Sequence, residues 1–363
     1  MSAANACAFF AQTYAEARAG FLAAAQAAGL AVQSHPHPLK GRDGEDLAMD
    51  VVRDGPADAP ALLLVSSACH GVEGFCGSGV QRALLADAAF RQQARAAGVA
   101  VLYVHALNPW GFSWWRRTTH ENVDLNRNFH DFSAPLPVNP AYDELATAVV
   151  PDEWPSPAAE ARLQAYAATH GERARQTAIS SGQHAHPQGL FFGGTAATWS
   201  QQTLRRVLQA HGRQAQRLGW IDLHTGLGPS GHGEKIFASR DDAAALARAR
   251  AWWGADVTSI YDGSSNSARL TGLMWLAAEQ ECPQATYTGI ALEYGTVPWD
   301  EVTLALRADQ WLENHPAVQG PQRQAIKQRL RDVFYTDTDA WKTQIVAQGL
   351  TAARQAVVGL AAA

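Results

Sequence analysis

The chain has 363 residues, of which 47% are hydrophobic and 17% are charged. This composition supplies enough apolar side chain for a sizeable core and excludes an intrinsically disordered protein. The formal net charge is −5 and no long run of Lys or Arg is present, which argues against nucleic acid as a partner. The length fits either one large α/β domain or two average ones.

Four cysteines occur without paired Cys-x-x-Cys spacing: Cys7, Cys69, Cys76 and Cys282. They predict reduced thiols, and therefore a cytoplasmic protein, rather than a disulfide framework or a cysteine zinc site. The N-terminal stretch has no leading basic cluster, so we expect no secretory signal there. No run approaches the ~20 apolar residues that cross a bilayer, so we expect no membrane partner.

Hydrophobic periodicity in the first third of the chain predicts alternating helices and strands. Apolar residues at helical spacing predict a helix over roughly residues 8–28, and the His-Pro-His-Pro run at 35–38 predicts a loop. A helix is expected at 76–97. Strands are expected at three further runs, 47–52, 61–67 and 99–107. The strand, helix, strand order of 61–107 indicates a parallel βαβ unit.

The rest of the chain continues this alternation after an interruption. Residues 130–195 are rich in Pro and acidic residues with few periodic signals, so we expect a loop-rich insertion. Regular elements then follow, with helices at 199–217 and 241–253 and strands at 218–224, 235–239 and 286–295. Residues 299–363 are expected to form C-terminal helices.

Internal repeats and low-complexity linkers are not found, so we expect a single domain over residues 1–363. Residues 1–45 would form its lead-in helix and loop. The predicted fold class is α/β, with a mixed, mostly parallel central sheet flanked by helices.

Two histidines fall where apolar strands end. His70 and Glu73 follow the strand at 61–67 in a His-Gly-Val-Glu run, and His224 ends the strand at 218–224. Ligands in open α/β sheets collect at the carboxyl ends of strands. Two histidines and one glutamate form a three-ligand set that leaves a catalytic Zn²⁺ one position for water. Each histidine alone is more often a hydrogen-bonded core residue, so only their combination favours a metal.

Two other segments carry polar residues in an apolar setting. The segment Asp124-Leu-Asn-Arg-Asn128 would by itself be a turn with surface ion pairs, and Arg116 would be a cation stacked on neighbouring tryptophans. Glu293 interrupts the apolar strand at 286–295. Since a buried unpaired carboxylate is costly, a metal, a water or an arginine is expected beside it.

In chain order the sequence carries His-x-x-Glu, Asn-Pro-x-Gly, Trp-Arg, Asp-x-Asn-Arg-Asn, a later strand-end His and then Glu. This order resembles the zinc metallocarboxypeptidase superfamily, peptidase family M14, over about residues 70–295. The runs HGVEGF, DLNRNF and DLHTGLGPSGHGE are similar to its bacterial DUF2817 branch. The resemblance implies a zinc carboxypeptidase-like fold and one Zn²⁺ per chain, held by His70, Glu73 and His224.

The resemblance also implies roles for residues around the metal. Asp124 would hold the second ring nitrogen of His70, which orients a ligand histidine. Asn126 and Arg127 would clamp the substrate carboxylate, a task that suits a planar guanidinium.

Two further residues would take part in the reaction itself. Arg116 would face the scissile carbonyl oxygen, and Glu293 would be the general base. The superfamily's substrate-contacting Tyr has no counterpart in the stretch LTGLMWLAAEQECP, and Tyr261 or Tyr287 could replace it from elsewhere in the chain.

Three remaining features concern the surroundings of the site. Cys69 is expected to be a small residue packed beneath the metal loop, and Glu234 a solvated charge in a turn. The interval from Glu73 to His224 is long because of the insertion, which could wall off the cleft and restrict it to small substrates.

The leading hypothesis is a zinc-dependent hydrolase that cleaves a peptide or amide bond next to a free carboxylate in a small peptide or acylated amino acid. An alternative is an N-acyl-amino-acid deacylase of the aspartoacylase or succinylglutamate desuccinylase type. A third hypothesis is a non-catalytic protein that binds through a metal-built pocket. The sequence leaves the oligomeric state open.

Overall fold

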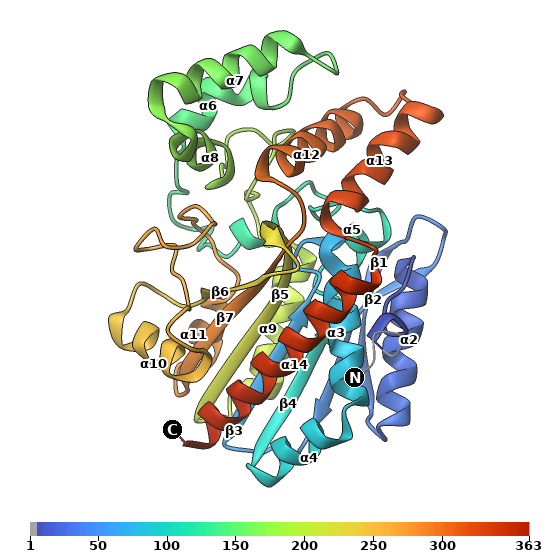
Figure 1. The fold of residues 1–363 in the computed structure, drawn as a ribbon, viewed down its shortest axis with the longest axis vertical. Helices are drawn as coiled ribbons and strands as arrows, with labels where there is room; N and C mark the ends of the chain where they lie inside the picture. The colour runs from blue at the N-terminus through green and yellow to red at the C-terminus, as the bar shows by residue number, and fades with distance from the viewer. Residues whose placement is uncertain (1–5, 363) are drawn as a thin grey trace.

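The computed structural model describes residues 6–362, and a seven-stranded mixed sheet forms its centre (Figure 1). The strands follow the spatial order β1-β2-β4-β3-β5-β7-β6. Their bounds are β1 Val32–Lys40, β2 Asp46–Asp54, β3 Ala61–Ser67, β4 Val99–His105, β5 Arg217–Ser230, β6 Gly233–Phe237 and β7 Thr286–Gly295. The predicted fold class is confirmed.

The four central strands β4, β3, β5 and β7 are parallel, and antiparallel strands extend the sheet at both sides. Every residue of β3 and β4 is buried, which explains their unbroken apolar sequences. Alternate residues of β3 face two different cores. Leu63 and Val65 join one core and Leu62 and Leu64 the other. Because the central strands are parallel, their carboxyl ends meet at one edge of the sheet.

Helices cover both faces of this sheet. The first core receives apolar side chains from α2 (Tyr14–Ala27), α3 (Gly74–Ala86), α4 (Ala88–Ala96), α10 (Ala243–Trp253) and α14 (Asp339–Ala362). The second core receives them from α9 (Trp199–Gly212) and α11 (Leu276–Glu281). The short α5 (Pro109–Ser113) follows β4 at the carboxyl edge.

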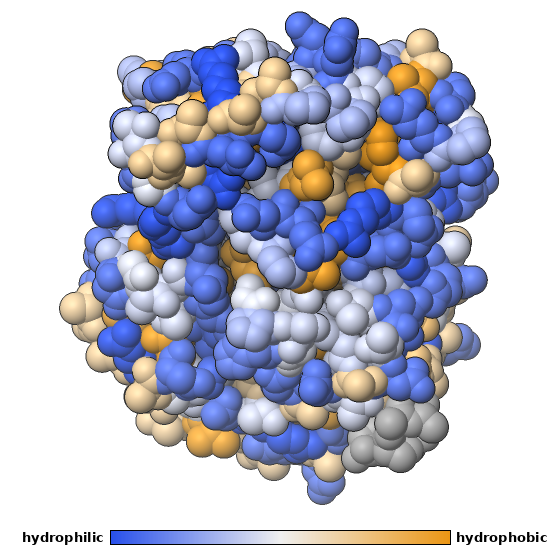
Figure 2. Space-filling view, turned by 45° about the horizontal axis from the view of Figure 1, so that its top comes forward, coloured by the Kyte–Doolittle hydropathy of each residue, from blue (hydrophilic) through white to orange (hydrophobic). Residues whose placement is uncertain are grey.

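A further layer of helices lies beyond the carboxyl edge, at the top of Figure 1. It consists of α6 (Pro140–Val149), α7 (Pro157–His170), α8 (Glu172–Ser180), α12 (Trp299–Asn314) and α13 (Pro321–Phe334). Their apolar residues form a third core of their own, to which Val72 also belongs. The molecular face in Figure 2 is mostly hydrophilic, with small and separate hydrophobic patches.

The expectation of a loop-rich insertion at 130–195 is wrong, because three helices occupy much of it. Asn139 and Ser156 accept hydrogen bonds from the first turns of α6 and α7, and a proline follows each of them at the first helical position. An Asx or Ser cap followed by Pro is a helix-start signal. Short helices with many alanines give weak periodicity, which hid them in the sequence.

Two other local expectations differ from the structure. The His-Pro-His-Pro run is part of strand β1, not a loop, because an edge strand tolerates prolines where no ladder hydrogen bond is needed. The single helix expected at 76–97 is two helices, since Asp87 ends α3 and its side chain caps α4 by accepting from Phe90 N.

The expectation that no segment could cross a membrane also needs correction. Among the described residues, α14 is long and apolar enough by length and composition to span a bilayer. It packs along the sheet against α3, α4 and α10, and residues such as Ile345, Ala353 and Leu360 are buried in the first core. A buried core helix passes the same test of length and composition, so core packing accounts for its apolar character.

Candidate metal centre

The residues predicted to bind metal come from two neighbouring strands. His70 follows β3, Glu73 lies in the short 3₁₀ helix η1 (Gly71–Glu73), and His224 lies on β5 beside β3. The turn after His70 needs a glycine, because a Cβ at Gly71 would lie 2.0 Å from the backbone carbon of Gly111. The parallel pairing of β3 with β5 therefore brings these side chains together at the carboxyl edge.

The three side chains converge on one point. His70 Nδ1 lies 2.8 Å from Glu73 Oε1, and His224 Nδ1 lies 3.0 Å from Glu73 Oε2. One ligand atom from each residue fits within a 4.8 Å span. All three are buried, with exposed fractions of 2–5%. Two imidazole nitrogens and one carboxylate around a common point are a donor set that Zn²⁺ accepts, so the residues fit a metal.

The opposite nitrogen of each ring faces a carboxylate. His224 Nε2 lies 2.5 Å from Asp222 Oδ2, and His70 Nε2 lies 3.3 Å from Asp124 Oδ1. Arg117 Nη2 is also 2.8 Å from His70 Nε2, but a guanidinium cannot accept a proton. If Nδ1 binds a metal, Nε2 carries the proton and Asp124 is its acceptor. Both rings are thus oriented with Nδ1 toward Glu73.

The electrostatics of the group also suit a cation. Burial acts to raise the pKa of Glu73, but the adjacent His70 and His224 outweigh it and hold the pKa well below its usual range. Burial acts to lower the pKa of His224, but the carboxylates of Asp222 and Glu73 raise it well above its usual range. The described carboxylates thus create a site that favours positive charge.

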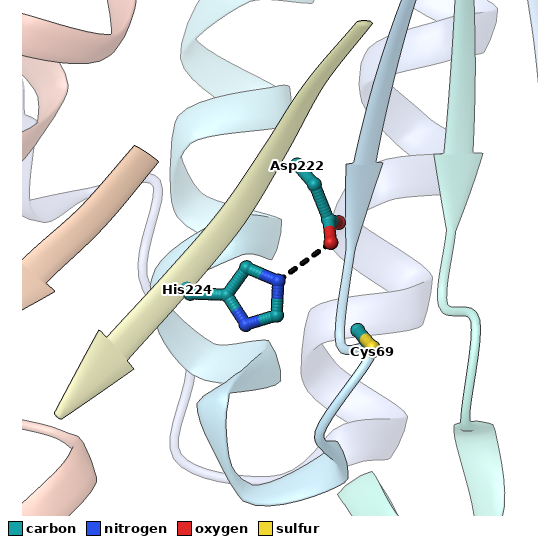
Figure 3. A group of neighbouring side chains, drawn as sticks. All are labelled: Cys69, Asp222 and His224. Carbon is teal, nitrogen blue, oxygen red and sulfur yellow. Dashed lines mark hydrogen bonds and ion pairs between the residues drawn. The ribbon is translucent and has the colours of Figure 1, made fainter. Parts of the chain in front are cut away.

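Cys69, Asp222 and His224 form a second group of neighbouring side chains that could in principle hold a metal (Figure 3). In this view Asp222 and His224 project from β5 toward the loop that carries Cys69. Burial raises the pKa of the Cys69 thiol well above its usual range, and Asp222 adds to the effect. The Nε2 atom of His224 lies 2.5 Å from Asp222 Oδ2, so a carboxylate already engages this side of the ring. Nδ1 of both histidines faces Glu73, so the set with His70 and Glu73 fits a metal better. Cys69 packs in the second core, as expected.

Asp222 was not among the residues predicted for the site. Its carboxylate accepts a hydrogen bond from Ser66 Oγ at 2.6 Å, and Trp220 Nε1 donates to that same Oγ at 2.7 Å. One sequence signal could have identified Asp222: it is a carboxylate two residues before His224 in an apolar strand. Residues i and i+2 of a strand share a face, so the two side chains are expected to lie side by side.

We expect Asp222→Asn to weaken Zn²⁺ binding by about 10- to 100-fold, since it removes the carboxylate that orients His224. Competition with a chelator of known affinity measures the change. Ser66→Ala is the matched control. It removes a hydrogen bond to Asp222 but keeps the contact between the Asp222 carboxylate and the His224 ring. Equal zinc affinity in Asp222→Asn and the unmodified protein would contradict this role.

A pocket opens beside the three candidate ligands and encloses about 690 Å³, including space open to solvent. Glu293 lines it from β7, directly opposite His224 in the strand register. Its Oε1 accepts a hydrogen bond from Leu227 N at 3.1 Å. Burial and the nearby Glu73 raise the pKa of Glu293 to about 8. A carboxyl group in this position can accept or return a proton close to neutral pH.

Asn126 and Arg127 line the same pocket from η2 (Leu125–Arg127). Asn126 Oδ1 accepts from Met274 N at 2.9 Å, so its amide nitrogen is the group that can face a ligand. Arg127 donates from Nε and Nη2 to Ser180 O at 3.1 and 2.6 Å. Burial lowers the pKa of Arg127 to about 10, so it is still a cation at neutral pH.

The expectation that Arg116 faces the pocket is wrong. Its Nε lies 2.9 Å from Asp309 Oδ2 on α12, and its Nη1 lies 3.4 Å from Glu313 Oε2. Arg116 is absent from the described pocket lining, whereas Arg117 is part of it. Arg117 Nε lies 2.9 Å from Asp124 Oδ2. Both arginines lie in the irregular loop after α5, where sequence spacing does not fix the direction of a side chain, so the tertiary fold decides which one faces the site.

Neither Tyr261 nor Tyr287 takes the place of the missing tyrosine. Tyr261 Oη donates to Ser239 O at 2.8 Å, and Tyr287 is buried in the second core. The described pocket lining contains no tyrosine, and its large aromatic residues are Phe191, Trp275, Trp299 and Phe334.

The fold and the site together define an α/β protein with a candidate metal centre at the carboxyl edge of its sheet. The family described as "Protein of unknown function (DUF2817)" matches residues 10–348, and the chain belongs to this family. A comparison with curated proteins finds no match.

Three solved structures are among those to which the chain is similar. Bovine thrombin-activatable fibrinolysis inhibitor, in complex with tick carboxypeptidase inhibitor, has a TM-score of 0.48 and 10% identity, over 96% of this chain and 97% of that chain. Carboxypeptidase A from Helicoverpa armigera has a TM-score of 0.44 and 13% identity, over 88% and 73%. An aspartoacylase family protein from Mesorhizobium loti has a TM-score of 0.37 and 14% identity, over 80% and 68%.

Proposed function

We propose that this protein is a zinc-dependent hydrolase that cleaves a peptide or amide bond next to a free carboxylate. The observation that carries the proposal is the convergence of His70 Nδ1, Glu73 and His224 Nδ1 in one buried group. The position of Glu293 on the wall of the adjoining pocket supports a hydrolytic role. A Zn²⁺ ion bound there would polarise a carbonyl group and lower the pKa of a water molecule.

Glu293 is proposed as the general base. It reaches the pocket from the strand beside His224, and the Leu227 N–H holds one of its oxygens. The other oxygen is then available to take a proton from water and pass it to the leaving nitrogen. A base positioned in this way contributes about 10²- to 10⁴-fold to a rate.

Asn126 and Arg127 are proposed to hold the substrate carboxylate. Both line the pocket, and Arg127 is a buried cation whose guanidinium is fixed by Ser180 and by its neighbour's carbonyl. The Nη hydrogens that these carbonyls leave free can donate to a carboxylate.

Arg117 takes the place first assigned to Arg116, as the cation beside the reacting carbonyl group. Its guanidinium is 3.3 Å from Glu73 Oε1 and lines the pocket next to the ligands. A fixed positive charge there favours the negative charge that develops on the carbonyl oxygen.

The free carboxylate gives a direct test of the proposed substrate class. We expect amidation of a peptide's C-terminal carboxylate to cost about 1.5–3 kcal/mol, or roughly 10- to 150-fold in kcat/KM, because Arg127 loses its anion. Arg127→Lys should weaken the use of free-carboxylate substrates, since a point charge cannot form a two-pronged contact. Equal cleavage of free and amidated peptides would contradict the proposal.

A parallel panel of dipeptides and N-acyl amino acids, each with the same carboxylate-bearing residue, separates the peptidase from the deacylase. Faster turnover of the dipeptides supports the carboxypeptidase-like activity. Faster turnover of the simple acyl derivatives supports the deacylase. If zinc binds and no member of either panel is cleaved, the non-catalytic binding protein is favoured.

A further inference from the structure

Helix α8 of the insertion meets the loop before α11 beside the pocket. Side chains of Arg173 and Gln176 reach across to residues 265–267, and we call this contact the bridge. Its two sides are far apart in sequence, so only the tertiary fold joins them. None of these residues was expected to take part in the site.

The bridge consists of four hydrogen bonds to three consecutive carbonyl groups. Arg173 donates to Ser267 O at 2.7 Å, to Asn266 O at 3.1 Å and to Ser265 O at 3.3 Å. Gln176 Nε2 donates to Asn266 O at 3.0 Å. Because one guanidinium contacts all three carbonyls, it holds the loop in one position relative to α8.

Both sides of the bridge line the pocket that holds the candidate ligands. Gln176 and Ser180 line it from α8, and Ser267 and Ala268 line it from the loop. The bridge therefore joins two segments of the pocket wall. Apolar residues of α12, including Val302 and Leu306, also line the pocket.

The inner side of the loop is fixed to the sheet by Glu234. Its Oε1 accepts from Thr258 Oγ1 at 2.6 Å and from Asn266 N at 3.1 Å, and its Oε2 accepts from Asn266 Nδ2 at 2.7 Å. The expectation of a solvated turn is wrong, because Glu234 is buried on β6 opposite Glu293. Loss of the bridge would therefore release α8 from the loop, while Glu234 still holds Asn266 on the sheet.

We propose that the bridge determines substrate length and limits this enzyme to short substrates, such as acylated amino acids and dipeptides. This inference rests on the proposed function. An extended chain needs about 3.3 Å for each added residue and must leave the pocket over its rim. Where α8 and the loop are joined, that exit is closed.

The first experiment uses N-acetylated substrates with one, two, three and five residues and the same C-terminal residue. We expect kcat/KM of the zinc-loaded protein to fall by at least about tenfold, or about 1.4 kcal/mol, from the dipeptide to the pentapeptide. In the variant Arg173→Ala/Gln176→Ala the ratio of pentapeptide to dipeptide should rise about tenfold. Arg162→Ala, which removes a similar contact between α7 and α6, is the control and should keep the ratio.

A second experiment does not depend on turnover. Ala268→Cys places a thiol on the buried pocket wall, and its labelling by iodoacetamide and by a bulky maleimide is followed by mass spectrometry. We expect the bulky reagent to react about tenfold faster once Arg173→Ala/Gln176→Ala is added, while Arg162→Ala leaves the rate unchanged. Arg173 is exposed and Gln176 is half-buried, so the variants should fold.

The two experiments separate the bridge from the proposed function. If substrates are cleaved with the same length dependence in every variant, the proposal for the bridge is overturned and the proposed hydrolase function is supported. If no substrate is cleaved but labelling by the bulky reagent increases, the hydrolase fails and the closing role of the bridge is supported. Equal labelling rates with and without the bridge would overturn the proposal that the bridge restricts access to the pocket.

Discussion

Replacement of Glu293 by glutamine is expected to lower kcat by about 10²- to 10⁴-fold while Zn²⁺ stays bound. Glutamine has nearly the same shape, and its oxygen can still accept from Leu227 N, but it cannot take a proton from water. His70, Glu73 and His224 are unchanged. Turnover with a free-carboxylate dipeptide and the zinc content of the purified variant are the two measurements.

Glu279→Gln is the matched control, because Glu279 is bound by Ser239 and Arg240 outside the candidate site. It should keep wild-type turnover. If Glu293→Gln kept near wild-type activity, Glu293 would not be the base. If it lost zinc in proportion to activity, its role would be in metal binding.

Removal of the metal is expected to abolish turnover completely, and addition of Zn²⁺ should restore it. The reason is that, in the proposed function, a bound Zn²⁺ would supply a Lewis acid that the side chains of this pocket cannot replace. His224→Gln should give the same loss without a chelator, because it removes one of three ligand atoms and disrupts the contact with Glu73. Zinc content and turnover should fall together.

His186→Gln is the control for the histidine substitution, since His186 pairs with Asp143 at the surface of the insertion. It should keep both zinc and activity. A metal-free preparation with undiminished activity in the presence of chelator would overturn the metal-dependent mechanism.

Much of the fold could be predicted from local sequence. The continuous apolar runs of β3 and β4 identify central strands, because buried parallel strands require apolar residues on both faces. The candidate ligands were found because His70 follows the apolar run of β3 and His224 follows an apolar run within β5. Helices α6 and α7 were missed, although Asn-Pro and Ser-Pro pairs mark their first turns.

The contacts around the candidate site could not be predicted in the same way. Arg116 and Arg117 are adjacent in sequence, and yet one pairs with Asp309 on α12 while the other faces the pocket. The choice depends on where α12 packs, nearly 200 residues later in the chain.

The α/β class, the central strands and the residues able to bind a metal follow from the sequence alone, because they depend on periodicity and on side-chain chemistry near each strand end. The tertiary structure was needed to show that Asp222 supports His224, that Arg117 lines the pocket and that Arg173 joins α8 to residues 265–267. Each of these depends on the direction of a side chain and on a partner from a distant segment, and local sequence carries no signal for either.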